Sequence, residues 1–178
     1  MLTEPGGSLA DMASNAGAAP VQYGEVFTRR WIVELILDLC GYSAATDLTT
    51  KRLVEPAIGS GAFLMPVLDR LLEAREKYSP GGPWDELLPA ILAMDVQPGH
   101  VRSCRRLVTG RLTRSGCPAE TANRLAAAWV REGDFLLDRF PGGADYVVGN
   151  PPYIRIDPFS SVRADVDHSM IAMEAFGG

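Results

Sequence analysis

The stretch Arg52–Leu64, with the sequence RLVEPAIGSGAFL, predicts a short strand, a loop that contains glycines, and the start of a helix. Gly59 and Gly61 allow a tight turn and a close approach of the backbone to a ligand. The loop lacks the Gly-Lys-Ser/Thr of a phosphate-binding P-loop and carries two of the three glycines of a dinucleotide fingerprint. Taken alone, this Gly-x-Gly segment fits an ordinary turn as well as a cofactor site.

Further strand and helix signals alternate along the chain. The apolar run Ala90–Met94 predicts a strand that is buried on both faces and is followed by Asp95. A third strand is expected to end at residues 133–134, and a fourth covers residues 145–149. Helices are expected over residues 64–78, 98–114 and 120–129, with a short one over 84–88. This alternation predicts an α/β fold with a doubly wound, mainly parallel, Rossmann-like sheet.

Ahead of the first strand, residues 28–41 predict a largely buried helix. Thr28 is placed to cap its N-terminus, and Gly41 is placed to end it. The apolar residues at helical spacing are Trp31, Ile32, Leu35, Ile36 and Leu39, with Val33 and Leu37 widening the stripe.

Polar side chains stand at the carboxyl ends of all four predicted strands. They are Glu55, Asp95, Asp134 and Asn150. Ligands of doubly wound sheets bind at this edge, and an acidic residue after the second strand is suited to a ribose hydroxyl pair. Each residue alone is also explained as a turn former or a helix cap. Together they predict a single binding crevice.

The segment Asn150-Pro151-Pro152-Tyr153 follows the fourth strand. Its prolines have no N–H to donate to a neighbouring strand, so the chain leaves the sheet at Asn150. The side-chain amide of Asn150 offers one hydrogen-bond acceptor and two donors. Carbonyl acceptors and the flat face of Tyr153 suit a planar substrate that bears an exocyclic amino group. A proline-stiffened loop with a packed tyrosine explains the motif equally well when it is taken alone.

Composition excludes several classes of protein. The formal charge of −5 gives no general attraction to nucleic acid, and the arginines of residues 98–114 are interpreted as a solvated helix face. The three cysteines are far apart and the two histidines are isolated, so neither a disulfide framework nor a metal site is predicted. The chain shows no signal-peptide or membrane-span pattern, so we expect a cytoplasmic protein with no membrane partner.

Read together, these motifs resemble the class I, S-adenosylmethionine-dependent amino-methyltransferases. The resemblance is greatest to the adenine-N6 DNA methyltransferases of restriction-modification systems, in the gamma order where the cofactor motif precedes the catalytic one. It covers residues 23 to about 155. Glu55 and Ile58 stand where Asp and Cys are commoner, and Arg29 stands where proline is usual.

This resemblance implies roles for individual residues. The implied cofactor-binding residues are Phe27, Thr28, Glu55, Pro56, Ala57, Gly59, Gly61, Phe63, Asp95, Asp134 and Phe135. The implied catalytic residues are Asn150, Pro151, Pro152 and Tyr153.

The resemblance also implies a domain organisation. Residues 1–20 are expected to be a disordered lead-in, and residues 21–178 a partial catalytic domain that stops after the fourth strand. The expected partner is DNA, bound through a target recognition domain that this sequence lacks, and a restriction endonuclease is expected as a separate or fused partner. Two alternatives stay open: a protein-glutamine or RNA base methyltransferase, and a non-catalytic portion that only binds the cofactor.

Overall fold

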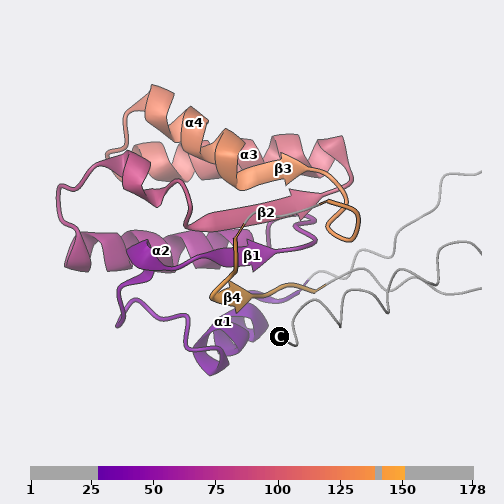
Figure 1. Cartoon of the computed structure of the whole chain (residues 1–178), viewed down its shortest axis with the longest axis horizontal. Helices are drawn as coiled ribbons and strands as arrows, with labels where there is room; N and C mark the ends of the chain where they lie inside the picture. Colours follow the sequence, from indigo (N-terminus) through magenta and orange to yellow (C-terminus); the bar gives the residue numbers. More distant parts are fainter. Residues whose placement is uncertain (1–27, 139–141, 151–178) are drawn as a thin grey trace, which may run out of the picture.

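The structure is a computed structural model that describes residues 28–138 and 142–150. Within these residues the chain forms four strands and four α-helices (Figure 1). The strands are β1 (Leu53–Glu55), β2 (Ile91–Asp95), β3 (Val130–Glu132) and β4 (Tyr146–Val147). The helices are α1 (Arg30–Leu39), α2 (Leu64–Tyr78), α3 (Pro98–Arg114) and α4 (Ala119–Trp129), with short 3₁₀ turns η1 (Leu48–Thr50) and η2 (Trp84–Leu87).

The strands form one sheet in the order β3-β2-β1-β4, and each of its three strand pairs is parallel. Leu53 pairs with Ile91 of β2 on one side and with Tyr146 of β4 on the other. The predicted α/β fold with a parallel sheet is therefore confirmed. The chain builds outward from β1 through β2 to β3 and then returns to the other side of β1, so the order reverses between β1 and β4. Ligands of parallel α/β sheets bind at such a reversal.

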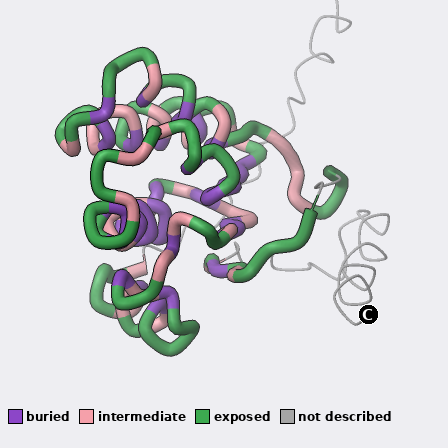
Figure 2. Tube along the Cα trace, turned by 60° about the vertical axis from the view of Figure 1, so that its left-hand side comes forward, coloured by how far each residue is buried: buried purple, intermediate pink, exposed green. Residues whose placement is uncertain are grey.

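The core lies mainly against one face of the sheet. Because side chains alternate along a strand, Leu53, Ile91 and Ala93 share one face, and all four helices contribute buried residues to the cluster that contains them. The opposite face carries a smaller cluster of Val54, Leu92 and Met94. In Figure 2 the buried residues gather where the helices meet the sheet, and the peripheral loops are largely exposed.

Helix α1 differs from its prediction. Val33 and Leu37 are fully buried, whereas Trp31 is 62% exposed and Leu39 is 78% exposed. The expectation of a largely buried helix was wrong, because α1 buries only Val33 and Leu37, packs the partly buried Ile36 against the core, and exposes Trp31, Leu35 and Leu39. Its predicted end is confirmed: Gly41 has a φ of 74°, and the N–H of Tyr42 donates to the carbonyl of Leu37 at 3.0 Å.

Trp129 joins α4 to the connection before β2. Its side chain is fully buried, and its indole N–H is shared between the carbonyls of Leu87 at 3.0 Å and Leu88 at 3.2 Å. Indole nitrogen is a donor only, so burial requires such an acceptor. The described residues include no helix that is long and apolar enough to cross a membrane.

Candidate active site

The strand ends that flank the reversal of the sheet line a hollow that is open to solvent on one side. Its volume is about 200 Å³, and its lining residues are Pro56, Ala57, Val147, Val148 and Gly149. Pockets that bury a whole drug-sized ligand begin at roughly 300 Å³, so this hollow suits a part of such a ligand. A Cβ added to Gly149 would lie 3.4 Å from Cδ of Pro56, so the end of β4 passes in contact with the loop after β1.

The glycine loop is a tight turn that requires glycine. Gly59 has a φ of 53° and Gly61 a φ of 86°, both in the left-handed region that favours this residue. The N–H of Ile58 donates to the carbonyl of Met94 at 2.9 Å, and the N–H of Gly61 donates to the carbonyl of Ile58 at 2.9 Å. The loop therefore folds across the end of β2 before α2 begins.

Asp95 braces this loop from the neighbouring strand. One carboxylate oxygen accepts from the N–H of Gly59 at 2.8 Å, and the other accepts from the N–H of Gln97 at 2.8 Å. Nδ1 of His100 lies 3.2 Å from the first oxygen. A carboxylate offers about four lone-pair sites, so little accepting capacity remains for the predicted ribose contact.

Glu55 ends β1 in the middle of the sheet and is only 1% exposed. Within the described part of the chain, its buried Oε2 atom has no hydrogen-bond partner. Burial and, secondarily, the negative charge of Asp95 raise the pKa of this carboxyl well above its ordinary range. A buried acceptor without a donor is costly, so this atom has the chemistry to receive a donor from a bound ligand.

Asp134 and Phe135 follow β3. The carboxylate of Asp134 accepts from the N–H of Leu136 at 2.9 Å, and the side chain is half-buried. Phe135 packs against the smaller cluster of Val54, Leu92 and Met94. Both residues thus stand at the carboxyl edge of the sheet, two strands away from β1.

Asn150 meets Thr28, a residue 122 positions earlier in the chain. Its Nδ2 donates to Oγ1 of Thr28 at 3.2 Å. The prediction that Thr28 caps α1 was wrong: the N-cap is Arg29, and no side-chain capping bond occurs among the described residues at this helix start. The threonine hydroxyl is directed to the asparagine instead.

The other predicted site residues have varied positions. Pro56 and Ala57 line the hollow, whereas Phe63 is 2% exposed and belongs to the core. Phe27 and residues 151–153, which include the predicted catalytic Pro151, Pro152 and Tyr153, lie outside the described residues.

Sequence reasoning missed two residues that touch the site, His100 and Cys104. The Cys104 thiol lies 3.6 Å from the carbonyl of Gly59, and burial raises its pKa to about 12. The helical spacing of Val101, Cys104 and Val108 indicated that Cys104 faces inward, but not which loop it contacts.

The fold and the site together define a parallel α/β protein consistent with the class I methyltransferases: a glycine loop after β1, acidic strand ends, and an asparagine after β4. No protein-family model matches the chain.

Comparison with curated proteins finds similarity to type II methyltransferases. The chain is 44% identical over 133 residues, 74% of its length, to the type II methyltransferase M.PaeR7I of Pseudomonas aeruginosa. It is 39% identical over 76% of its length to the type II methyltransferase M.XhoI of Xanthomonas vasicola. It is 33% identical over 75% of its length to the type II methyltransferase M.BstVI of Geobacillus stearothermophilus. The matches cover 23%, 25% and 25% of those proteins, so the chain spans about a quarter of their length.

Proposed function

We propose that this chain carries the cofactor-binding and catalytic residues of a restriction-modification DNA methyltransferase that transfers a methyl group from S-adenosylmethionine to N6 of adenine. The observation that carries the proposal is the position of Asn150: it follows β4 directly after Gly149, and Gly149 lies against Pro56 of the loop after β1, across the reversal of the sheet. The similarity to type II methyltransferases supports the same reaction class.

The residues present fit the cofactor. S-adenosylmethionine, when bound, supplies an electrophilic methyl group on a sulfonium, and it also carries an ammonium, a ribose and an adenine. The unpartnered Oε2 of Glu55 is an acceptor suited to the ammonium, and Asp95, with Gly59, Gln97 and His100 around it, has about one remaining lone-pair site for a ribose hydroxyl. Asp134 is an acceptor suited to the adenine amino group, while the turn at Gly59 and Gly61 brings the backbone close to the ligand.

Asn150 would act on the substrate amino group. Its Nδ2 donates to Thr28, so its Oδ1 is the atom left to accept an N–H from the substrate. Accepting that hydrogen bond orients the nitrogen lone pair toward the methyl group and stabilises positive charge as it develops on the amino group. The second acceptor, the carbonyl of Pro151, and the stacking face of Tyr153 remain predictions from the sequence.

A target adenine must leave the duplex for this chemistry, because its amino group is inaccessible within the stacked helix. We therefore expect DNA as the macromolecular partner, held mainly by a recognition domain outside the part of the chain described, and a restriction endonuclease of the same specificity. The formal charge of −5 agrees with this expectation, because the positive charges that attract DNA would then belong to the recognition domain.

The test uses the protein expressed from its complete reading frame. Binding of S-adenosylmethionine is measured by calorimetry, and methylated nucleosides from DNA are identified by mass spectrometry. Asn150→Ala is expected to lower turnover by about a hundredfold or more while cofactor affinity is largely retained. The matched control is Asn123→Ala on α4, whose Oδ1 accepts from Thr109 at 3.2 Å on the exposed surface.

Two results would contradict the proposal. One is an Asn150→Ala variant that methylates DNA as fast as the wild type. The other is a methylated product found in RNA or on a protein glutamine but not in DNA, which would establish the alternative substrate class.

A further inference from the structure

We infer that Thr28 is a positioning residue for Asn150: its hydroxyl accepts from Nδ2 of the asparagine amide and thereby anchors the amide with Oδ1 free to accept from the substrate amino group. The inference rests on the proposed function of Asn150. It moves Thr28 from the cofactor-binding role implied by the sequence to a role in the methyl-transfer step itself.

The orientation of the asparagine amide decides whether it can act. An amide has an oxygen that only accepts and a nitrogen that only donates, and the two exchange places when the group flips. In the structure Nδ2 faces Oγ1 of Thr28 at 3.2 Å. In the flipped orientation Nδ2 would face the substrate amino group, and two donors would meet. The Thr28 hydroxyl can accept from Nδ2 or donate to Oδ1, so it holds the amide in place in either orientation. The substrate N–H then favours the orientation of the structure, because only there does each end of the amide meet a complementary group.

Thr28 is available for this contact because it does not cap its own helix. A threonine that immediately precedes a helix commonly accepts from the first free N–H groups of that helix. Here the N-cap is Arg29, with a φ of −64° and a ψ of 141°, and its first turn carries no side-chain capping bond among the described residues. The Thr28 hydroxyl makes no capping hydrogen bond to α1 and instead accepts from Asn150, which follows β4.

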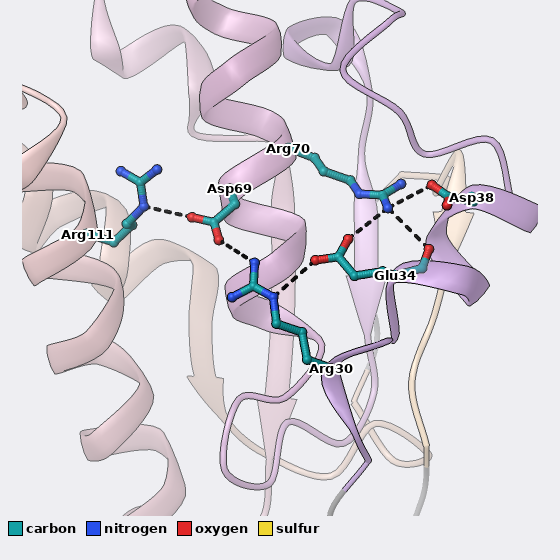
Figure 3. Close-up of polar contacts among 6 residues, drawn as sticks. All are labelled: Arg30, Glu34, Asp38, Asp69, Arg70 and Arg111. Carbon is teal, nitrogen blue, oxygen red and sulfur yellow. Dashed lines mark hydrogen bonds and ion pairs between the residues drawn. The ribbon is translucent and has the colours of Figure 1, made fainter. Parts of the chain in front are cut away.

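A network of ion pairs ties α1 to the rest of the fold two residues after Thr28 (Figure 3). Arg30 pairs with Asp69 of α2 at 3.2 Å, and Asp69 also pairs with Arg111 of α3 at 2.7 Å. Arg70 of α2 pairs with Glu34 at 2.8 Å and with Asp38 at 2.7 Å.

The members of this network differ in strength. Arg30 is 68% exposed, so its own pairs contribute little, whereas the side chain of Arg70 is only 15% exposed and also donates to the carbonyl of Tyr42 at 2.7 Å. Arg70 therefore holds α1 against α2.

The asparagine is held from the sheet side. The N–H of Val148 donates to the carbonyl of Val54 at 2.9 Å, and Val148 is 5% exposed. Thr28 and Asn150 are thus each attached to a rigid element, α1 in one case and β4 in the other. Supports of this kind fix the geometry of a catalytic group to within a fraction of an ångström.

The first test observes the contact itself in the 178-residue chain by NMR. The two side-chain amide proton signals of Asn150 are assigned from their loss in Asn150→Asp. Thr28→Val removes the acceptor without changing the side-chain shape, and it is expected to move and broaden both signals. Thr28→Ser keeps a hydroxyl and is expected to leave them near their wild-type positions. Unchanged Asn150 signals in Thr28→Val would overturn the inference whether or not the chain methylates DNA.

The second test separates positioning from cofactor binding in the protein expressed from its complete reading frame. Thr28→Val is expected to lower kcat by about tenfold to a hundredfold while affinity for S-adenosylmethionine changes by less than about twofold. Thr28→Ser should recover most of the lost turnover. The matched control is Thr109→Val, which breaks the exposed Thr109–Asn123 pair and should not affect turnover.

The outcomes of the two proposals differ. A wild-type protein that methylates no DNA counts against the proposed function, and the NMR result then decides only whether Thr28 orients the amide of Asn150. Weaker cofactor binding in Thr28→Val with unchanged kcat would show that Thr28 serves the cofactor and would overturn the inference while leaving the proposed function intact.

Discussion

The carboxylate of Asp95, at the end of β2, accepts a hydrogen bond of 2.8 Å from the backbone N–H of Gly59 in the loop that follows β1. The same side chain accepts from the N–H of Gln97 with its other oxygen. A single carboxylate thus joins the ends of two neighbouring strands and holds the shape of the glycine loop before any ligand arrives.

Asp95→Asn is expected to loosen this loop, because an amide has one accepting oxygen where the carboxylate has two. We expect hydrogen exchange at the Gly59 amide to become at least about tenfold faster, as the bond to a charged acceptor is lost. Affinity for S-adenosylmethionine should fall with it. For the exchange measurement the control is Asp134→Asn, because the carboxylate of Asp134 accepts from Leu136 and not from the glycine loop. Equal exchange at Gly59 in wild type and Asp95→Asn would contradict this account.

Glu55 is expected to make stability depend on pH. Because its pKa is raised in the folded chain, the folded state keeps a proton that the unfolded state releases. The contribution of Glu55 to the free energy of unfolding is therefore fully present below the pKa that its carboxyl has in the unfolded chain. It is lost as the pH rises toward the higher pKa that the carboxyl has in the folded chain. The wild-type free energy of unfolding should fall by about 1.4 kcal/mol per pH unit across that window.

Glu55→Gln should remove that slope, since an amide does not titrate. Urea unfolding at several pH values between about 5 and 8 measures it. The control Glu86→Gln changes an exposed residue of η2 and should keep the wild-type slope. Parallel slopes in wild type and Glu55→Gln would show that Glu55 is not held protonated.

Gly61 and Cys104 are expected to be coupled. Alanine at position 61 must adopt a φ of 86°, at a cost of about 1–2 kcal/mol, and its Cβ would lie 3.2 Å from the Cys104 sulfur. Gly41→Ala is the control, because that residue has a φ of 74° but its added Cβ meets no described atom within 4 Å. Gly61→Ala should destabilise more than Gly41→Ala, and adding Cys104→Ala should recover part of the difference in a double-mutant cycle. Strictly additive effects would refute the coupling.

Trp129→Phe is expected to destabilise the chain by about 1–3 kcal/mol, because the smaller ring leaves a cavity in the core and the carbonyls of Leu87 and Leu88 lose the indole N–H, although the carbonyl of Leu87 keeps the N–H of Ala90. Unfolding followed by circular dichroism measures this change. Trp31→Phe is a matched control, since Trp31 is 62% exposed and its replacement should stay within about 0.5 kcal/mol of wild type. Similar losses at the two positions would mean that the indole hydrogen bond does not stabilise the fold.

Much of the fold could be predicted because its signals are local. The apolar run before Asp95, the glycine loop and the proline at the start of α3 each mark an element without reference to distant residues. The strand ends could be placed on one edge because parallel strands share a direction. The face of α1 could not be predicted, since apolar residues surround most of that helix and only packing selects which of them is buried.

The sequence by itself determined the succession of strands, loops and helices and the polar residue that follows each strand, because burial patterns and turn residues act within a few positions. Only the tertiary structure decided which polar groups meet. Asp95 reaches Gly59 because β1 and β2 are neighbours, and Glu55 is buried because β1 lies between β2 and β4. Thr28 meets Asn150 because the strand order reverses at β1. That reversal brings the end of β4 close to the start of α1, the first helix of the described residues. Contacts across more than a hundred residues depend on strand order, and no local pattern encodes it.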